Sequence, residues 1–83
     1  MMKLKVIGPN QTEITMGGKV LFFSYDTLVI VRDLNERVCY CTSEKYSKTT
    51  SKHFNTYIKK EGITLDRCQF VNQKFLESLG ESL

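Results

Sequence analysis

The sequence has no tryptophan, one proline, one histidine and only three cysteines among its 83 residues. An odd number of cysteines is a poor basis for a disulfide framework. The longest apolar run, residues 28–31, is strand-sized and far below the ~20 residues that a membrane-spanning helix needs. The N-terminus lacks the apolar stretch of a signal peptide. We therefore expect one globular domain over residues 1–83, located in the cytoplasm and not bound to a membrane.

The first half of the chain alternates polar and apolar residues, as half-buried strands do. Gly17 and Gly18 separate two such segments, and both tolerate the positive φ that a tight hairpin turn requires. Residues 27–32 are β-branched and apolar on both faces, which indicates a central strand. The pattern predicts strands at residues 3–7, 11–16, 19–23, 27–32 and 37–42.

The pattern changes to helical spacing after residue 48. Phe54, Tyr57 and Ile58 fall on one face of a helix predicted over residues 49–61, with Gly62 as its stop. Residues 65–71 suggest a short strand at a sheet edge, and a short C-terminal helix follows, with Phe75 and Leu76 on its apolar side. The predicted fold class is α+β: a small antiparallel sheet of about five strands, then a basic amphipathic helix and a short C-terminal helix, both on one face.

Acidic residues are missing from residues 45–60, which contain five lysines, whereas the rest of the chain has seven basic and nine acidic residues. The first turn of a helix favours Asp and Glu, because the helix dipole places partial positive charge there. Here Lys48, Lys52 and His53 occupy the approach and the first turn, and no capping box is present. Such a departure from local preference is expected at functional sites. It predicts a site for a phosphate or a carboxylate, although solvated lysines beside an ordinary cap would give the same pattern.

The predicted ligand-binding residues surround the start of this helix. Hydroxyl groups would donate to the anion, lysines would neutralise it, and the imidazole with a tyrosine would orient or stack on the ligand. Core or rim packing is the commoner role of such tyrosines. The residues are Ser47, Lys48, Thr49, Thr50, Ser51, Lys52, His53, Tyr25 and Tyr46.

Catalytic and metal-binding residues are not predicted. His53 could be drawn into a triad with Ser24 and Asp26, but no spacing supports one, so we expect no enzyme. Cys39 and Cys41 point the same way on a strand, and with a distant Cys68 and the histidine they could supply four zinc ligands. The usual metal spacing is wider, so small core residues are the expected role. We expect no metal and no cofactor.

Three segments form a distinctive pattern: Gly8-Pro9-Asn10, residues 23–27, and above all the string from Tyr46 to Tyr57, which contains Ser47-x-Thr49-Thr50-Ser51-Lys52-His53. Together these segments resemble a family of small bacteriophage and prophage proteins of unknown function. Relatives often have Trp where this chain has Tyr46 and Tyr57. The resemblance covers most of the chain and implies a phage protein in the host cytoplasm, with no assigned activity.

Together these features predict a phage accessory protein that binds an anionic group without catalysis. The ligand would be a nucleotide, a nucleic acid bound weakly, or an acidic host protein, and a counter-defence role fits the setting. The alternative is a structural phage protein, active as a homo-oligomer, with no small-molecule ligand.

Overall fold

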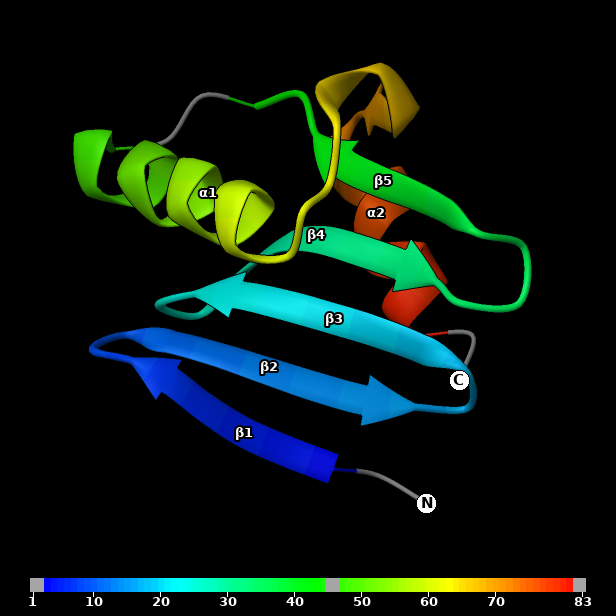
Figure 1. Cartoon of the computed structure of the whole chain (residues 1–83), viewed down its shortest axis with the longest axis horizontal. Coiled ribbons are helices and arrows are strands. Elements are labelled where there is room, and N and C mark those ends of the chain that lie inside the picture. Colours follow the sequence, from blue (N-terminus) through cyan, green and yellow to red (C-terminus); the bar gives the residue numbers. More distant parts are fainter. Residues whose placement is uncertain (1–2, 45–46, 82–83) are drawn as a thin grey trace.

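A six-stranded sheet forms the centre of the computed structural model, which describes residues 3–44 and 47–81. The strands lie side by side in the order in which they occur in the chain (Figure 1). The predicted ranges are confirmed to within one or two residues, apart from the last strand, which is shorter. The strands are β1 (Lys3–Gly8), β2 (Gln11–Met16), β3 (Lys19–Ser24), β4 (Thr27–Asp33), β5 (Val38–Thr42) and β6 (Cys68–Val71).

The sheet is antiparallel from β1 to β5, and β6 then pairs with β5 in parallel. The prediction of an entirely antiparallel sheet is therefore wrong at its last strand. The physical reason is the connection, because a helix lies between β5 and β6, and a crossover helix returns the chain to the same end of the sheet. Cys39 of β5 is opposite Cys68 of β6 as a result.

The two helices, α1 (Lys48–Lys60) and α2 (Gln73–Glu81), cover opposite faces of the sheet (Figure 1). The expectation that both lie on one face is wrong, because β3, β4 and β5 carry apolar side chains on both of their faces and each face needs a cover. A short 3₁₀ helix, Leu65–Arg67, leads into β6. In the described part of the chain no helix is long and apolar enough to cross a membrane.

Each helix closes its own hydrophobic cluster. The α1 side contains Phe22, Val29, Ile30, Cys39, Cys41, Tyr57 and Ile58, and the α2 side contains Leu21, Leu28, Val31 and Leu76. The predicted apolar faces are confirmed: Tyr57, Ile58 and Leu76 are buried, and Phe54 packs against the first cluster. Cys39 and Cys41 are core residues, as expected.

Both ends of α1 are capped by the chain itself. The hydroxyl oxygen of Ser47 accepts a hydrogen bond from the Thr50 backbone N–H at 3.2 Å, which makes Ser47 the N-cap. At the other end Gly62 has φ +67°, and the N–H groups of Gly62 and Ile63 donate to the carbonyls of Lys59 and Ile58. This is the Schellman arrangement, and it confirms Gly62 as the helix stop.

Tyr57 fixes α1 on the sheet. Its ring stacks on Phe22 of β3, with ring centroids 4.1 Å apart and an interplanar angle of 21°. Its hydroxyl donates to Glu13 Oε2 of β2 at 2.7 Å and accepts from Arg32 Nη1 of β4 at 3.3 Å. Arg32 also forms an ion pair of 2.9 Å with Glu61 at the end of the helix. One residue of α1 thus contacts three neighbouring strands.

Replacing Tyr57 with phenylalanine tests this role. We expect Tyr57→Phe to lower the free energy of unfolding by about 1–3 kcal/mol, because the stack survives while the half-buried Glu13 and Arg32 lose their hydrogen bonds to the hydroxyl. Urea denaturation measures the change. Tyr40→Phe is the matched control, since no hydrogen bond of its hydroxyl is recorded within residues 3–44 and 47–81. Equal effects of the two substitutions would contradict the role of the hydroxyl network.

Candidate functional site

The predicted site residues of α1 divide into two groups. Lys48, Thr49, Ser51 and Lys52 are exposed on the first turns, as is the capping residue Ser47. Thr50 is buried, and His53 is half-buried, as expected. Tyr46 lies outside the described residues.

A buried hydroxyl that the sequence did not single out as a binding residue joins Thr50 and His53. Ser24, at the end of β3, is 0% exposed; its Oγ lies 2.8 Å from His53 Nδ1 and 3.2 Å from Thr50 Oγ1. Thr50 Oγ1 also accepts from the Ser47 hydroxyl at 3.3 Å. The only sequence signal was the polar interruption of the apolar strand at residues 24–26. Ser24 therefore links the β3–β4 turn to the start of α1.

Tyr25 lies beside His53 in space, as the predicted site required, although the two are far apart in sequence. Their ring centroids are 5.8 Å apart and tilted by 38°. Tyr25 has φ +57°, a left-handed conformation that is uncommon for a bulky residue. Its backbone N–H donates to the Asn10 carbonyl at 2.7 Å, and its side chain is 48% exposed. The turn thus holds an exposed aromatic ring next to the imidazole.

Hydroxyl donors are fewer at this surface than the sequence suggested. Ser47 already satisfies the Thr50 amide, and Thr50 Oγ1 is enclosed by Ser24 and Ser47. The first turn of α1 carries no acidic residue, and Lys48 and Lys52 are exposed at i, i+4 spacing, where like charges repel. The side chains open to a ligand are therefore Lys48, Thr49, Ser51 and Lys52 on the helix, with His53 and Tyr25 at its flank.

Two hollows lie near α1. One of about 280 Å³ is bordered by Thr50, Ser51 and Phe54 of the helix and by Phe70 and Glu44. Its lining includes Thr50 and Ser51 of the predicted site but none of the lysines.

The larger hollow, of about 530 Å³, lies at the opposite end of the helix. Arg32, Arg37 and Arg67 line it, together with Cys39 and Thr64.

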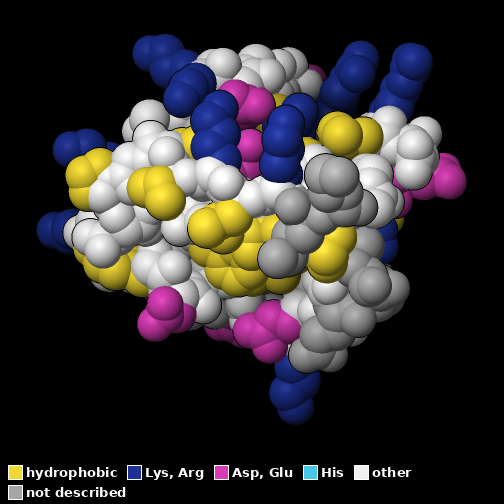
Figure 2. Space-filling model, turned by 90° about the horizontal axis from the view of Figure 1, so that it is seen from below, with side chains coloured by type: hydrophobic (Ala, Val, Ile, Leu, Met, Phe, Trp, Pro, Cys, Tyr) yellow, Lys and Arg dark blue, Asp and Glu magenta, His cyan; other side chains and the backbone are white. Residues whose placement is uncertain are grey.

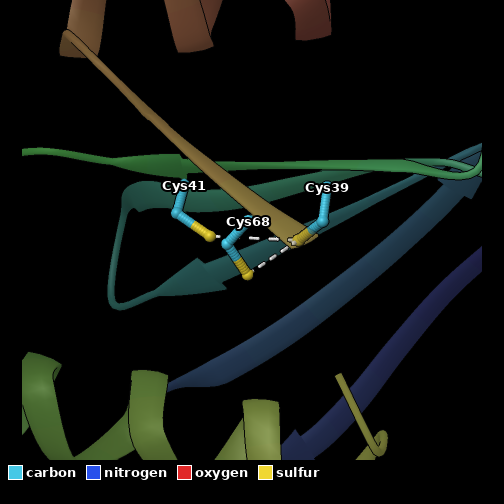
Figure 3. A group of neighbouring side chains, drawn as sticks. All are labelled: Cys39, Cys41 and Cys68. Carbon is cyan, nitrogen blue, oxygen red and sulfur yellow. Dashed lines mark hydrogen bonds between the residues drawn. The ribbon is translucent and has the colours of Figure 1, made fainter. Parts of the chain in front are cut away.

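The three cysteines meet beside this larger hollow, which the sequence did not predict. Cys39 Sγ lies 3.9 Å from Cys41 Sγ and 3.7 Å from Cys68 Sγ (Figure 3). A hydrogen bond with Cys41 is the main cause that lowers the Cys39 pKa to about 7; burial opposes it, while Cys68 and the charge of Arg32 assist. The same bond raises the Cys41 pKa, and burial raises that of Cys68. These thiols are the residues of the described chain best placed to hold a metal.

The fold is that of a small α+β protein with a sheet between two helices. The start of α1 is basic and lies beside the aromatic ring of Tyr25. The chain belongs to a family of unknown function, DUF8033, whose sequence profile matches residues 2–74. The match includes α1 and all six strands. Neither the curated proteins nor the solved structures gave a match.

Ser24→Ala tests whether the buried hydroxyl positions His53. We expect a loss of about 1–3 kcal/mol in unfolding free energy, because His53 Nδ1 and Thr50 Oγ1 each lose a partner. We also expect weaker nuclear Overhauser contacts between the rings of Tyr25 and His53, measured by NMR. Ser51→Ala, an exposed hydroxyl on the same helix, is the control. Unchanged ring contacts in Ser24→Ala would show that Ser24 does not position the imidazole.

Proposed function

We propose that this protein is a non-enzymatic binding protein that holds an anionic group at the exposed start of α1. The observation that carries the proposal is the placement of the Tyr25 ring against His53, beside the turn that bears Lys48 and Lys52. Lysine side chains neutralise an anion, and an exposed aromatic ring offers a stacking surface for a base. A nucleotide has both features and is the ligand class we favour.

Electrostatics support the same surface. An anion bound between Lys48 and Lys52 would relieve their mutual repulsion and would also interact favourably with the positive end of the helix dipole. The repulsion is worth about 0.2–0.5 kcal/mol, and the dipole interaction about 0.3–1 kcal/mol at an exposed site. The helix amides contribute less than a bare helix start would, because Ser47 already caps Thr50.

A catalytic role is less well supported. Ser24 and His53 lie at hydrogen-bonding distance, but the Ser24 side chain is fully buried and cannot reach a substrate in this arrangement. Asp26 is exposed, and within residues 3–44 and 47–81 no hydrogen bond joins it to His53. We therefore assign this pair a positioning role.

The resemblance to bacteriophage proteins supports a setting in an infected host. A small phage protein that captures a nucleotide signal or an acidic surface of a host protein could act in counter-defence. This step rests on the setting and the charge of the helix start alone.

Thermal denaturation with a panel of anions tests the binding proposal. The panel contains phosphate, sulfate, mononucleotides, cyclic dinucleotides and a short single-stranded DNA, at low and moderate salt. A ligand at 100 times its dissociation constant stabilises the folded state by about 2.7 kcal/mol. We expect Lys52→Ala to abolish the shift, and Lys60→Ala, which removes the same charge from the last turn of α1, to retain it.

Tyr25→Asn separates stacking from charge, because asparagine tolerates the left-handed backbone at this position. It should weaken nucleotide binding and leave phosphate binding unchanged. Absence of stabilisation by every anion would refute the proposal, as would equal losses in Lys52→Ala and Lys60→Ala. A shift with DNA alone, lost steeply with salt, would indicate non-specific nucleic-acid binding instead.

The alternative function, a structural protein that self-associates, is favoured by one observation. β1 is an outer strand of the sheet, and its Leu4 and Val6 are 63% and 71% exposed. Figure 2 looks onto this side of the molecule and shows apolar side chains gathered in the middle of the face, with most of the Lys and Arg side chains toward its upper border. An apolar edge strand is a template for pairing with another chain.

Light scattering tests this alternative. It predicts a dimer or larger assembly for the wild type, and a monomer for Val6→Lys, because a charge would then be placed in the interface. Lys5→Gln is the control on the same strand, since its side chain points to the other face. A wild type that remains monomeric across a wide concentration range would exclude self-association.

A further inference from the structure

The cysteines form a compact group of thiols from two strands. Cys39 and Cys41 are two residues apart on β5, so their side chains point to the same face. Cys68 is opposite Cys39 in the parallel pairing of β5 with β6. Figure 3 shows the three sulfur atoms pointing toward one another on that face. All three thiols are free, and all three sulfurs lie within 4.8 Å of one another.

The sulfur separations match those of a metal–thiolate centre. With metal–sulfur bonds of about 2.3 Å, two ligands are about 3.8 Å apart in tetrahedral geometry and about 4.0 Å apart in trigonal geometry. The sulfur–sulfur separations are 3.9 Å for Cys39–Cys41 and 3.7 Å for Cys39–Cys68. These values are far from the ~2.0 Å of a disulfide bond. Two of the three sulfur pairs therefore stand at ligand spacing, and the third pair, Cys41 and Cys68, lies within 4.8 Å.

We propose that Cys39, Cys41 and Cys68 form a binding site for a thiophilic d¹⁰ metal ion, Zn²⁺ or Cu⁺. Thiolates are the ligands that select these ions. Binding replaces any proton on each thiol with a bond to the metal and transfers no electron, so up to three protons are released to solvent. This assignment replaces the expectation that the cysteines serve only as core residues.

The surroundings fit the charge of the bound site. Three thiolates with Zn²⁺ carry a net charge of −1, and with Cu⁺ a net charge of −2. Arg32, Arg37 and Arg67 line the adjoining hollow, where Asp33 and Glu61 are the acidic residues. The side chains that line the hollow therefore carry a net charge of +1. The positive charge of Arg32 also helps to lower the pKa of Cys39. A partly desolvated anionic centre needs such a neighbour.

The hollow also gives the metal a route of entry. It has a volume of about 530 Å³ and is lined by Cys39, so this cysteine is the one that an ion entering the hollow would meet first. No fourth Cys, His, Asp or Glu joins the cluster among the described residues. A three-coordinate Cu⁺ would need none, whereas Zn²⁺ would complete its four ligands with a water molecule from the hollow.

Metal titration of the full chain under anaerobic, reducing conditions tests the proposal. Zn²⁺ and Cu⁺ are each titrated in competition with a chromophoric chelator, and native mass spectrometry gives the stoichiometry. We expect one ion per chain and a weakening on the order of 100-fold or more in Cys68→Ser, the variant at the half-buried ligand. Co²⁺ used as a spectroscopic probe should give sulfur-to-metal charge-transfer bands that diminish in the same variant.

The control is Phe70→Ser, which alters an exposed residue on the same strand and should retain binding. Circular dichroism without metal checks that each variant folds. If Cys68→Ser does not fold, Cys39→Ser removes a different ligand and replaces it in the test. Selective tight binding of one ion identifies the resident metal. Failure of both ions to bind at one per chain, or binding by Cys68→Ser as tight as that of the wild type, would overturn the assignment.

Discussion

The structure depends on the contact between Tyr57 and the sheet. Its ring stacks on Phe22, and its hydroxyl links Glu13 of β2 with Arg32 of β4. An aromatic stack whose hydroxyl is hydrogen-bonded fixes both the position and the rotation of a helix. A shift or a rotation of the helix would leave that buried hydroxyl without its hydrogen-bond partners. The orientation of α1 in turn decides which residues meet Ser24 at one end and which border the arginine-lined hollow at the other.

The sequence predicted the local elements well because their signals are local. Alternation placed the strands, Gly17 and Gly18 marked the hairpin, and Gly62 marked the end of the helix. The apolar face of α1 was also predictable, since residues 54, 57 and 58 share a face at helical spacing. Each of these inferences uses residues within a few positions of one another.

The errors concern how elements combine in space. The parallel pairing of β6 and the placement of the helices on opposite faces depend on the path of the connection, which side-chain periodicity does not encode. The same limit applies to the site. Ser24 and His53 are 29 residues apart, as are Cys39 and Cys68, and only the tertiary fold brings each pair together. The charge pattern indicated the start of α1 as the candidate site. It did not indicate that the hydroxyls of Ser24 and Thr50 are buried there.

The hydrogen bond from the Tyr25 N–H to the Asn10 carbonyl has a consequence for communication across the sheet. Both residues sit in left-handed turns, one between β1 and β2 and the other between β3 and β4, so the two loops are fastened at the same end of the molecule. A displacement of the outer hairpin therefore pulls directly on the backbone that carries the Tyr25 ring. This bond adds to the pairing of β2 with β3 in coupling the edge of the sheet to the start of α1.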